Sequence, residues 1–261
     1  MSMFSDAFLT ATLLTTMAGL STTVGSLVAV FYREPGPRYM ALALGFSAGV
    51  MIHVSYVELL NGSMGRLAEG GMGADEAFAL AHLALFAGFV LMLIIDVFVS
   101  HSYIMETGEK EAEMQRMGLL VALGVAIHNF PEGMATFGAT LQDPSVGLAV
   151  AIAVAIHNIP EGVAVAVPIY RATGSARKAF TWSFLSGVTE PLGAILAGLL
   201  LMPALSIPWV LPCTLCLVAG FMIYIAFDEL LPVAHSYGQE HVAILGVLAG
   251  MAVMALSLGL L

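Results

Sequence analysis

Charged side chains are scarce in this chain: Asp, Glu, Lys and Arg make up 10% of its 261 residues. Soluble globular domains carry about 25% charged residues and roughly 45–50% apolar ones, whereas 59% of this chain is hydrophobic. A soluble fold is therefore excluded, and the chain is predicted to lie in a bilayer. Long polar stretches are also missing, which leaves little room for a separate soluble domain.

Cysteines and basic residues are few as well, with two of the former and eight of the latter. Cys213 and Cys216 form one C-x-x-C, but a zinc site usually needs a second such pair, so small core residues are the favoured interpretation. No nucleic-acid partner is expected. Asp6 is the only charge before the first apolar run, and that run is too long for a signal peptide.

Long apolar runs account for most of the chain. A membrane-spanning helix needs about 20 apolar residues, and eight stretches qualify. They lie at about 7–31, 39–61, 77–98, 117–139, 145–170, 178–202, 209–232 and 241–260. The prediction is an all-α integral membrane protein with eight transmembrane helices in a single domain over residues 1–261.

The basic residues indicate which way the chain is oriented. Seven of them follow the first, third and fifth stretches: Arg33, Arg38, Lys110, Arg116, Arg171, Arg177 and Lys178. Only Arg66 lies in an even-numbered loop. Because Lys and Arg concentrate in cytosolic loops, loops 32–38, 99–116 and 171–178 are predicted to be cytosolic, with both termini outside.

Two internal repeats are present. The segment Ala-Ile-His-Asn-Phe-Pro-Glu-Gly-Met-Ala at 126–135 returns almost unchanged at 155–164. In addition, 48–60 aligns with 219–231, which makes the second and seventh stretches counterparts of opposite direction. This predicts an inverted repeat of helices one to three and six to eight around helices four and five, an organisation typical of secondary transporters.

The central repeat carries metal-ligating side chains. His128 and Glu132 are four residues apart, as are His157 and Glu161, so each pair shares one helical face. Two neighbouring helices would then offer four convergent ligands near the middle of the membrane. Ionisable groups at that depth are costly and usually functional.

Further donors surround these four residues. Asn129 and Asn158 could present carbonyl oxygens to a second ion that the glutamates bridge, and Glu190 and Met51 also lie near mid-membrane. Pro131 and Pro160 cannot donate to the carbonyls one turn earlier, which frees backbone oxygens beside the ligands. Imidazole, thioether and carboxylate together suit Zn²⁺ and its first-row neighbours better than Ca²⁺ or Mg²⁺.

A purely structural role is the alternative for this pattern. One buried His–Glu pair could be a hydrogen bond between helices. Two copies of His-Asn-x-Pro-Glu-Gly plus a third intramembrane glutamate weaken that reading, since each such group costs about 2.5–3.5 kcal/mol at the helix centre.

At these residues the sequence resembles the ZIP (Zrt/Irt-like) metal transporters, especially the bacterial ZupT-like branch. The resemblance covers the whole chain. Its strongest motifs are His128-Asn129-Phe130-Pro131-Glu132-Gly133, His157-Asn158-Ile159-Pro160-Glu161-Gly162, Ser186-Gly187-x-x-Glu190 and Asp228-Glu229-Leu230-Leu231-Pro232.

The resemblance implies uptake of divalent transition metals, with zinc as substrate and iron, manganese, cobalt and cadmium as further candidates, across a prokaryotic cytoplasmic membrane. It implies two adjacent ion positions, an elevator-like alternation of access and no resident cofactor. It also implies that metal leaves through carboxylates at the cytosolic ends of the third and seventh helices, here Asp96, Asp228 and Glu229.

Several assignments stay open. Glu58, seven residues after Met51 on the same face, is a candidate for the entrance. For His53 and His82 a packed or interfacial role is favoured over a ligand role, and for His235 and His241 a solvated one. The rival function is a membrane-embedded dimetal carboxylate enzyme, but the Glu-x-x-His spacing of such enzymes is absent, so the chain is not expected to be an enzyme. The oligomeric state is undetermined, with a homodimer as one alternative.

Overall fold

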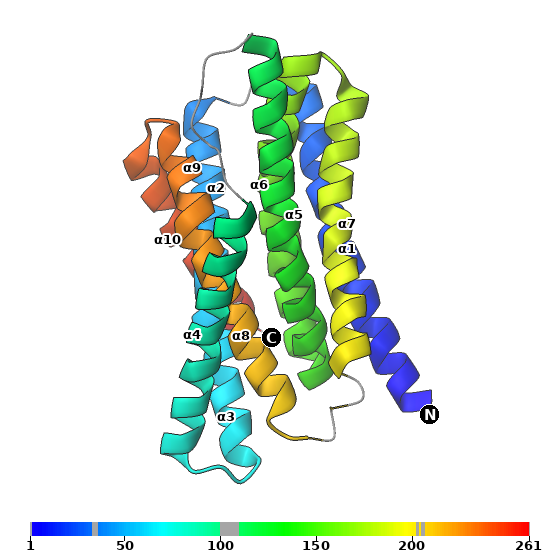
Figure 1. Ribbon diagram of the computed structural model, residues 1–261, viewed down its shortest axis with the longest axis vertical. Helices are drawn as coiled ribbons and strands as arrows, with labels where there is room; N and C mark the ends of the chain where they lie inside the picture. Colours follow the sequence, from blue (N-terminus) through cyan, green and yellow to red (C-terminus); the bar gives the residue numbers. More distant parts are fainter. Residues whose placement is uncertain (1, 33–35, 100–109, 202–203, 205–206, 261) are drawn as a thin grey trace.

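The computed structural model describes the chain except residues 1, 33–35, 100–109, 202–203, 205–206 and 261 (Figure 1). No strand occurs among the described residues, so the all-α prediction is confirmed. Residues 33–35 of the loop predicted at 32–38 and residues 100–109 of the loop predicted at 99–116 lie outside the described residues. The helical segments are α1 (Ser2–Tyr32), α2 (Pro37–His53), η1 (Val54–Leu60), α3 (Asn61–Glu69), α4 (Ala74–Val99), α5 (Lys110–Gln142), α6 (Pro144–Thr173), α7 (Ala176–Leu201), α8 (Val210–Ile225), η3 (Ala226–Leu230), α9 (Leu231–Ser236) and α10 (Glu240–Leu260).

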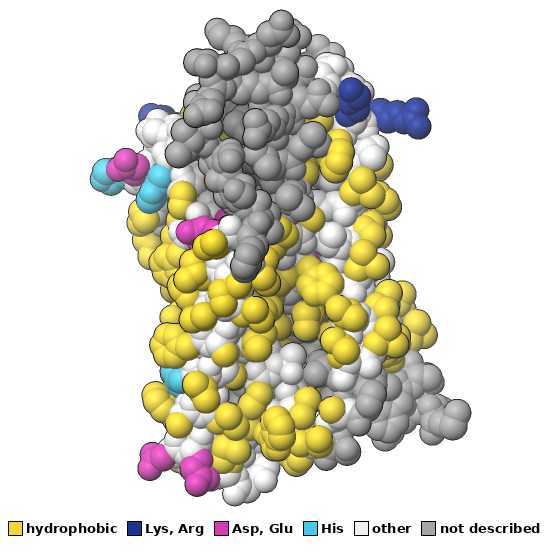
Figure 2. All heavy atoms as spheres, in the orientation of Figure 1, with side chains coloured by type: hydrophobic (Ala, Val, Ile, Leu, Met, Phe, Trp, Pro, Cys, Tyr) yellow, Lys and Arg dark blue, Asp and Glu magenta, His cyan; other side chains and the backbone are white. Residues whose placement is uncertain are grey.

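The helices have the length and surface of membrane spans. Seven helical stretches are long and apolar enough to cross a bilayer, and the remaining predicted stretch, 117–139, lies within α5. Figure 2 shows hydrophobic side chains in a band between the two ends, with Lys and Arg side chains at the upper end. Side chains such as Leu83 and Leu199 are exposed by 68% and 67%. In a bilayer this band would face the acyl chains.

The second and seventh predicted stretches each contain a π-helical segment. The segment η1 joins α2 to α3 without a break, and η3 joins α8 to α9 in the same way. When 48–60 is aligned with 219–231, η1 and η3 overlap, so the sequence repeat recurs in the backbone. Single π-helical segments are frequent at functional sites. Glu58 lies in η1 and Glu229 in η3.

The helices form two bundles that stand side by side in Figure 1. The site bundle consists of α1, α5, α6 and α7, which pack on one another. The flanking bundle consists of α2, α4, α8 and α10 with the short segments between them. The two bundles meet mainly where α2 contacts α6 and where α5 contacts α8.

The pairing of helices is reciprocal, as the predicted inverted repeat requires. In the site bundle α1 packs on α6 as α7 packs on α5, and in the flanking bundle α2 packs on α10 as α8 packs on α4. The two contacts between the bundles, α2 with α6 and α8 with α5, are related in the same way. The internal two-fold relation of the fold therefore pairs helix one with six, two with seven, three with eight and four with five.

Glycines make these pairings close. A methyl group on Gly25 of α1 would overlap the Ile159 carbonyl of α6, and one on Gly193 of α7 would overlap the Phe130 carbonyl of α5. Ile159 and Phe130 occupy the same position in the two central repeats. Small residues allow helix backbones to approach closely in membranes, and here they bring α1 close to α6 and α7 close to α5.

Candidate metal site

A one-residue connection sets the register between α5 and α6. Asp143 alone separates them, and its Oδ1 accepts hydrogen bonds from the Ser145 backbone N (2.8 Å) and hydroxyl (2.6 Å). These hydrogen bonds hold the pKa of the Asp143 carboxyl below its ordinary value, and the Ser145 hydroxyl contributes more than the Ser145 backbone N–H. Glu132 and His157 lie about three to four turns from this connection on either side. The antiparallel helices therefore bring them to the same level.

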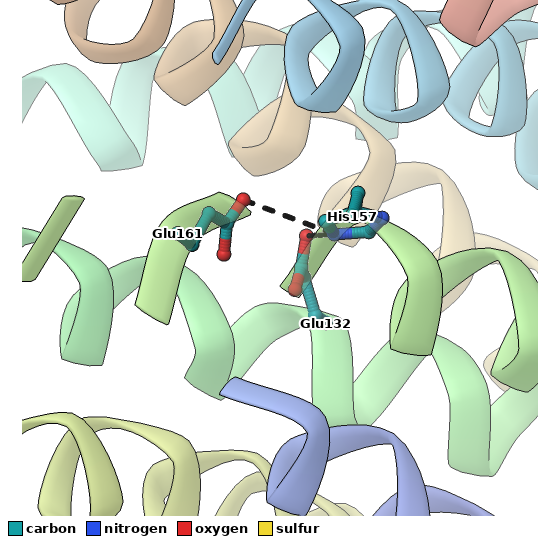
Figure 3. Close-up of side chains that lie close together, drawn as sticks. All are labelled: Glu132, His157 and Glu161. Carbon is teal, nitrogen blue, oxygen red and sulfur yellow. Dashed lines mark hydrogen bonds and ion pairs between the residues drawn. The ribbon is translucent and has the colours of Figure 1, made fainter. Parts of the chain in front are cut away.

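Three buried side chains meet between these helices (Figure 3). The Nε2 of His157 lies 2.9 Å from Glu132 Oε1 and 4.0 Å from Glu161 Oε1, and all three side chains are fully buried. One ligand atom from each residue lies within 4.8 Å of the other two. One imidazole and two carboxylates form a donor set that transition metals such as zinc accept.

The ring of His157 is held by neighbouring backbone. Its Nδ1 lies 3.1 Å from the carbonyl of Ala153, one turn earlier in α6. Because a carbonyl only accepts, this hydrogen bond needs a proton on Nδ1, while Nε2 faces the two carboxylates. Metal-binding histidines usually fix their second nitrogen in this way. From the flanking bundle, the Ser47 hydroxyl of α2 donates to the His157 carbonyl at 3.1 Å.

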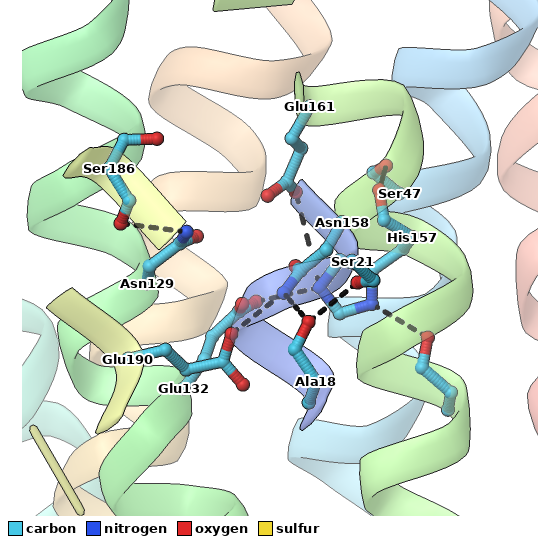
Figure 4. Close-up of polar contacts among 11 residues, drawn as sticks. Ala18, Ser21, Ser47, Asn129, Glu132, His157, Asn158, Glu161, Ser186 and Glu190 are labelled. Atoms are coloured by element: carbon cyan, nitrogen blue, oxygen red, sulfur yellow. Dashed lines mark hydrogen bonds and ion pairs between the residues drawn. The ribbon is translucent and has the colours of Figure 1, made fainter. Parts of the chain in front are cut away.

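A second polar group lies beside the first, formed by the paired asparagines (Figure 4). The Asn158 amide donates to Glu190 Oε2 at 2.7 Å and to the Ala18 carbonyl at 3.1 Å. The Asn129 amide donates to the Ser186 carbonyl at 3.2 Å. Asn129, Asn158 and Glu190 are fully buried. Within the described part of the chain, no partner reaches Oδ1 of either asparagine or Oε1 of Glu190.

These oxygens are orphaned in the part of a membrane protein where polar groups are most costly to leave unpaired. Amide and carboxylate oxygens are ligands for hard divalent cations. Side by side, the two groups offer one position with imidazole and carboxylate donors and one with oxygen donors alone.

Not every predicted ligand can be placed. His128 lies in α5, but its side chain is outside the described residues. Met51 is fully buried in α2, one turn beyond Ser47 and thus on the helix that contacts α6.

The predicted exit residues lie apart from the central site, in the flanking bundle. The Tyr224 hydroxyl donates to Asp96 Oδ2 at 3.0 Å and also lies close to the Asp228 carboxylate. Asp228 is exposed, whereas Glu229 is 7% exposed. The structure thus brings α4 and η3 together through Tyr224. Glu58, the predicted entrance residue, is partly buried and lies within the electrostatic reach of Arg66 and Asp143.

Comparison with known proteins identifies the family. Residues 100–258, which include both central repeats, match the family model described as ZIP zinc transporter. The chain is 54% identical over 261 residues to the zinc transporter ZupT of Chlorobium phaeovibrioides, covering 96% of this chain and 97% of that protein. It is 48% identical over 261 residues to the ZupT of Streptococcus mutans, covering 97% and 98%.

The chain belongs to the ZIP family. ZIP proteins are transporters and not enzymes, so the dimetal enzyme considered from the sequence is set aside. The helices of this ZIP chain also agree with a multi-pass membrane protein.

Sequence reasoning missed the contribution of α1 to the site of this ZIP protein. The Ala18 carbonyl accepts a hydrogen bond from the Asn158 amide, and Gly25 lets α1 approach α6 closely. A signal was available, because Ala18-Gly19 and Gly25 match the spacing of Ser186-Gly187 and Gly193 in α7. Ser47 and Tyr224 were also missed, and no pattern in the sequence singled them out.

Proposed function

We propose that the chain takes up divalent metal ions, zinc among them, across a prokaryotic cytoplasmic membrane, with the whole chain acting as one transmembrane domain. The observation that carries the proposal is the buried group of Glu132, His157 and Glu161 between α5 and α6, of which α6 is long and apolar enough to span a membrane. Three ionisable groups in that setting are costly unless a cation balances them. The names of the relatives, zinc transporters, support zinc as the substrate.

The site holds two ions. The first binds to His128, Glu132, His157 and Glu161, with Met51 nearby. The second binds to Asn129, Asn158 and Glu190 and shares the two glutamates. The orphaned amide and carboxylate oxygens of the second group support this division. Iron, manganese and cobalt are carried as well, because these donor types also bind zinc's first-row neighbours. Cadmium is carried because it is the heavier member of zinc's own group and accepts the same donors.

Access to the site alternates between the two sides of the membrane by relative movement of the two bundles. The limited contact between the bundles, through α2 with α6 and α5 with α8, supports a sliding boundary there. The metal-binding residues, Met51 excepted, belong to the site bundle, so that bundle carries the ions in an elevator-like step. Inverted repeats commonly work in this way.

The direction of transport follows from the predicted orientation. Both termini lie outside, ions enter past Glu58, and they leave past Asp96, Asp228 and Glu229. The exposed Asp228 and the partly buried Asp96 are nearer to water than the central site and bind ions more weakly, which favours release. The packing of α4 on α8 supports one shared exit route.

Zinc uptake into proteoliposomes tests the proposal. Wild-type protein should fill the vesicles with zinc, whereas Glu132→Ala and Glu161→Ala should nearly abolish uptake. A Leu199→Ala variant, altered on the lipid-facing surface, serves as the control for insertion and reconstitution. Full uptake with unchanged apparent affinity in both glutamate variants would refute the site.

A further inference from the structure

Helices α1 and α7 present matching surfaces to the site. Ala18-Gly19-x-Ser21 of α1 aligns with Ser186-Gly187-x-Thr189 of α7. A methyl group on Gly19 would overlap the Gly187 carbonyl, and one on Gly187 would overlap the Gly19 carbonyl. The hydroxyls match too, since Ser21 donates to the Ala18 carbonyl and Thr189 to the Ser186 carbonyl.

Asn129 of α5 and Asn158 of α6 form equivalent hydrogen bonds with these two surfaces. The Asn158 amide donates to the Ala18 carbonyl, and the Asn129 amide donates to the matching Ser186 carbonyl. One turn further, Gly162 packs on the Thr22 carbonyl as Gly133 packs on the Glu190 carbonyl. Under the internal two-fold relation, Thr22 of α1 therefore corresponds to Glu190 of α7.

Thr22 and Glu190 also lie in equivalent surroundings. The Glu190 Oε2 lies 3.1 Å from where a Cβ on Gly19 would stand, next to Ala18, the acceptor of Asn158. The Thr22 Cβ lies 3.2 Å from the corresponding position on Gly187, next to Ser186, the acceptor of Asn129. The pair of Thr22 and Asn129 is thus the counterpart of the pair of Glu190 and Asn158, with a hydroxyl in place of a carboxylate.

The Thr22 hydroxyl differs from the hydroxyls of the three threonines in the first half of α1. Thr12, Thr15 and Thr16 each donate to the carbonyl four residues earlier. Thr22 is fully buried, and its Oγ1 meets no hydrogen-bond partner among the described residues. The carbonyl it would use, that of Ala18, already accepts from Asn158. Both Thr22 Oγ1 and Asn129 Oδ1 are therefore buried oxygens that lack partners.

We propose that Thr22 and Asn129 form a neutral binding position for a divalent cation. This position is the two-fold counterpart of the Glu190–Asn158 pair. The inference rests on the proposed function, since it concerns the path of the transported ion. In the predicted orientation α1 runs inward and α7 outward, so Thr22 lies on the cytosolic side of the Gly19–Gly187 crossing and Glu190 on the outer side. An ion leaving the charged site towards the cytosol therefore passes Thr22.

A neutral position suits that task. Hydroxyl and amide oxygens bind divalent cations, yet they add no charge to hold the ion, and movement through a membrane requires sites that bind weakly enough to be left. Replacing the hydroxyl by a methyl group leaves the ion only the Asn129 oxygen at this position. The step out of the charged site is then slowed, while binding to the charged site itself stays as it was.

Thr22→Val tests the proposal because it removes the hydroxyl and keeps the shape. Zinc turnover in proteoliposomes should fall roughly tenfold, the loss typical of a displaced supporting ligand. The zinc affinity of the detergent-solubilised protein should change by less than about twofold, since the ground-state site is intact. Thr22→Ser, which keeps the oxygen, should match the wild type.

Two further variants separate a ligand from a packing effect. Thr15→Val is the matched control, because Thr15 is equally buried in α1 but its hydroxyl is bonded to the Ala11 carbonyl. It should transport as the wild type does. Thr22→Asp adds a negative charge to the position formed by Thr22 and Asn129. We expect this variant to retain about one additional zinc ion per chain and to release zinc more slowly.

The outcomes distinguish this inference from the proposed function. Wild-type turnover in Thr22→Val, or an equal loss in Thr15→Val, would overturn the inference while zinc transport stands. Wild-type vesicles that neither bind nor take up zinc would overturn the proposed function, and this position with it.

Discussion

Replacing Gly133 by alanine tests whether the close approach of α5 and α7 positions Glu190. The added methyl group would overlap the Glu190 carbonyl oxygen and stand 2.6 Å from its carbonyl carbon and 3.0 Å from its Cα. These are backbone atoms, so the clash is relieved only if α7 moves away from α5. The movement would lengthen the 2.7 Å hydrogen bond between Asn158 and Glu190.

The size of the effect follows from two opposing terms. Alanine favours a helix over glycine by about 0.5–1 kcal/mol, whereas overpacking a tight contact costs about 1–3 kcal/mol. Because the obstacle is backbone, we expect a net loss of about 1–2 kcal/mol. For a chain of this size that corresponds to a midpoint lowered by about 2–8 °C in a thermal unfolding assay of the detergent-solubilised protein. Zinc affinity should fall in parallel.

A matched glycine provides the control. Gly65 lies in α3, and a methyl group there would meet nothing within 4 Å. Gly65→Ala should therefore leave the midpoint unchanged or slightly higher, with unaltered zinc binding. If Gly133→Ala had the same midpoint and affinity as Gly65→Ala, the idea that this contact positions Glu190 would be wrong.

Three further predictions concern other parts of the chain. Changing Asp96, Asp228 and Glu229 together to Asn or Gln should slow zinc turnover more than it weakens binding, and loss of the tightest binding would show that these carboxylates are the primary site. Cysteines introduced at positions 3 and 110 should react with an impermeant label from outside and inside, respectively, and the opposite result would reverse the orientation. The Asp143 pKa is lowered in the folded protein, so its stabilisation is present above the ordinary Asp pKa and lost as pH falls through the lowered one. Asp143→Ala should accordingly reduce the thermal midpoint at pH 7 and match the wild type at low pH, whereas a deficit that persists at low pH would refute this role.

The sequence predicted the features that repeat strongly. The central motifs of α5 and α6 are near-identical and carry a His and a Glu one turn apart, so the meeting of Glu132, His157 and Glu161 could be foreseen. The one-residue connection at Asp143 then fixes the two helices against each other. Hydropathy likewise located the spans, because each span is apolar along most of its length.

Other features could not be foreseen from the sequence. Helix α5 starts at Lys110, well before the stretch predicted from 117, because hydropathy detects only the apolar part of a helix. The π-helical turns of η1 and η3 were not foreseen, because hydropathy does not distinguish a π-helical turn from an α-helical one. The role of α1 was hidden because Thr22 stands where α7 has Glu190, so the two helices match only at small residues.

The location of bound zinc tests the central claim most directly. Crystals of the lipid-reconstituted protein grown with zinc, measured on both sides of the zinc absorption edge, would show the ion by its anomalous scattering. The account predicts a peak at about 2.0–2.2 Å from His157 Nε2 and from oxygens of Glu132 and Glu161. Zinc bound only at Cys213 and Cys216, or only at exposed carboxylates such as Asp228, would contradict it.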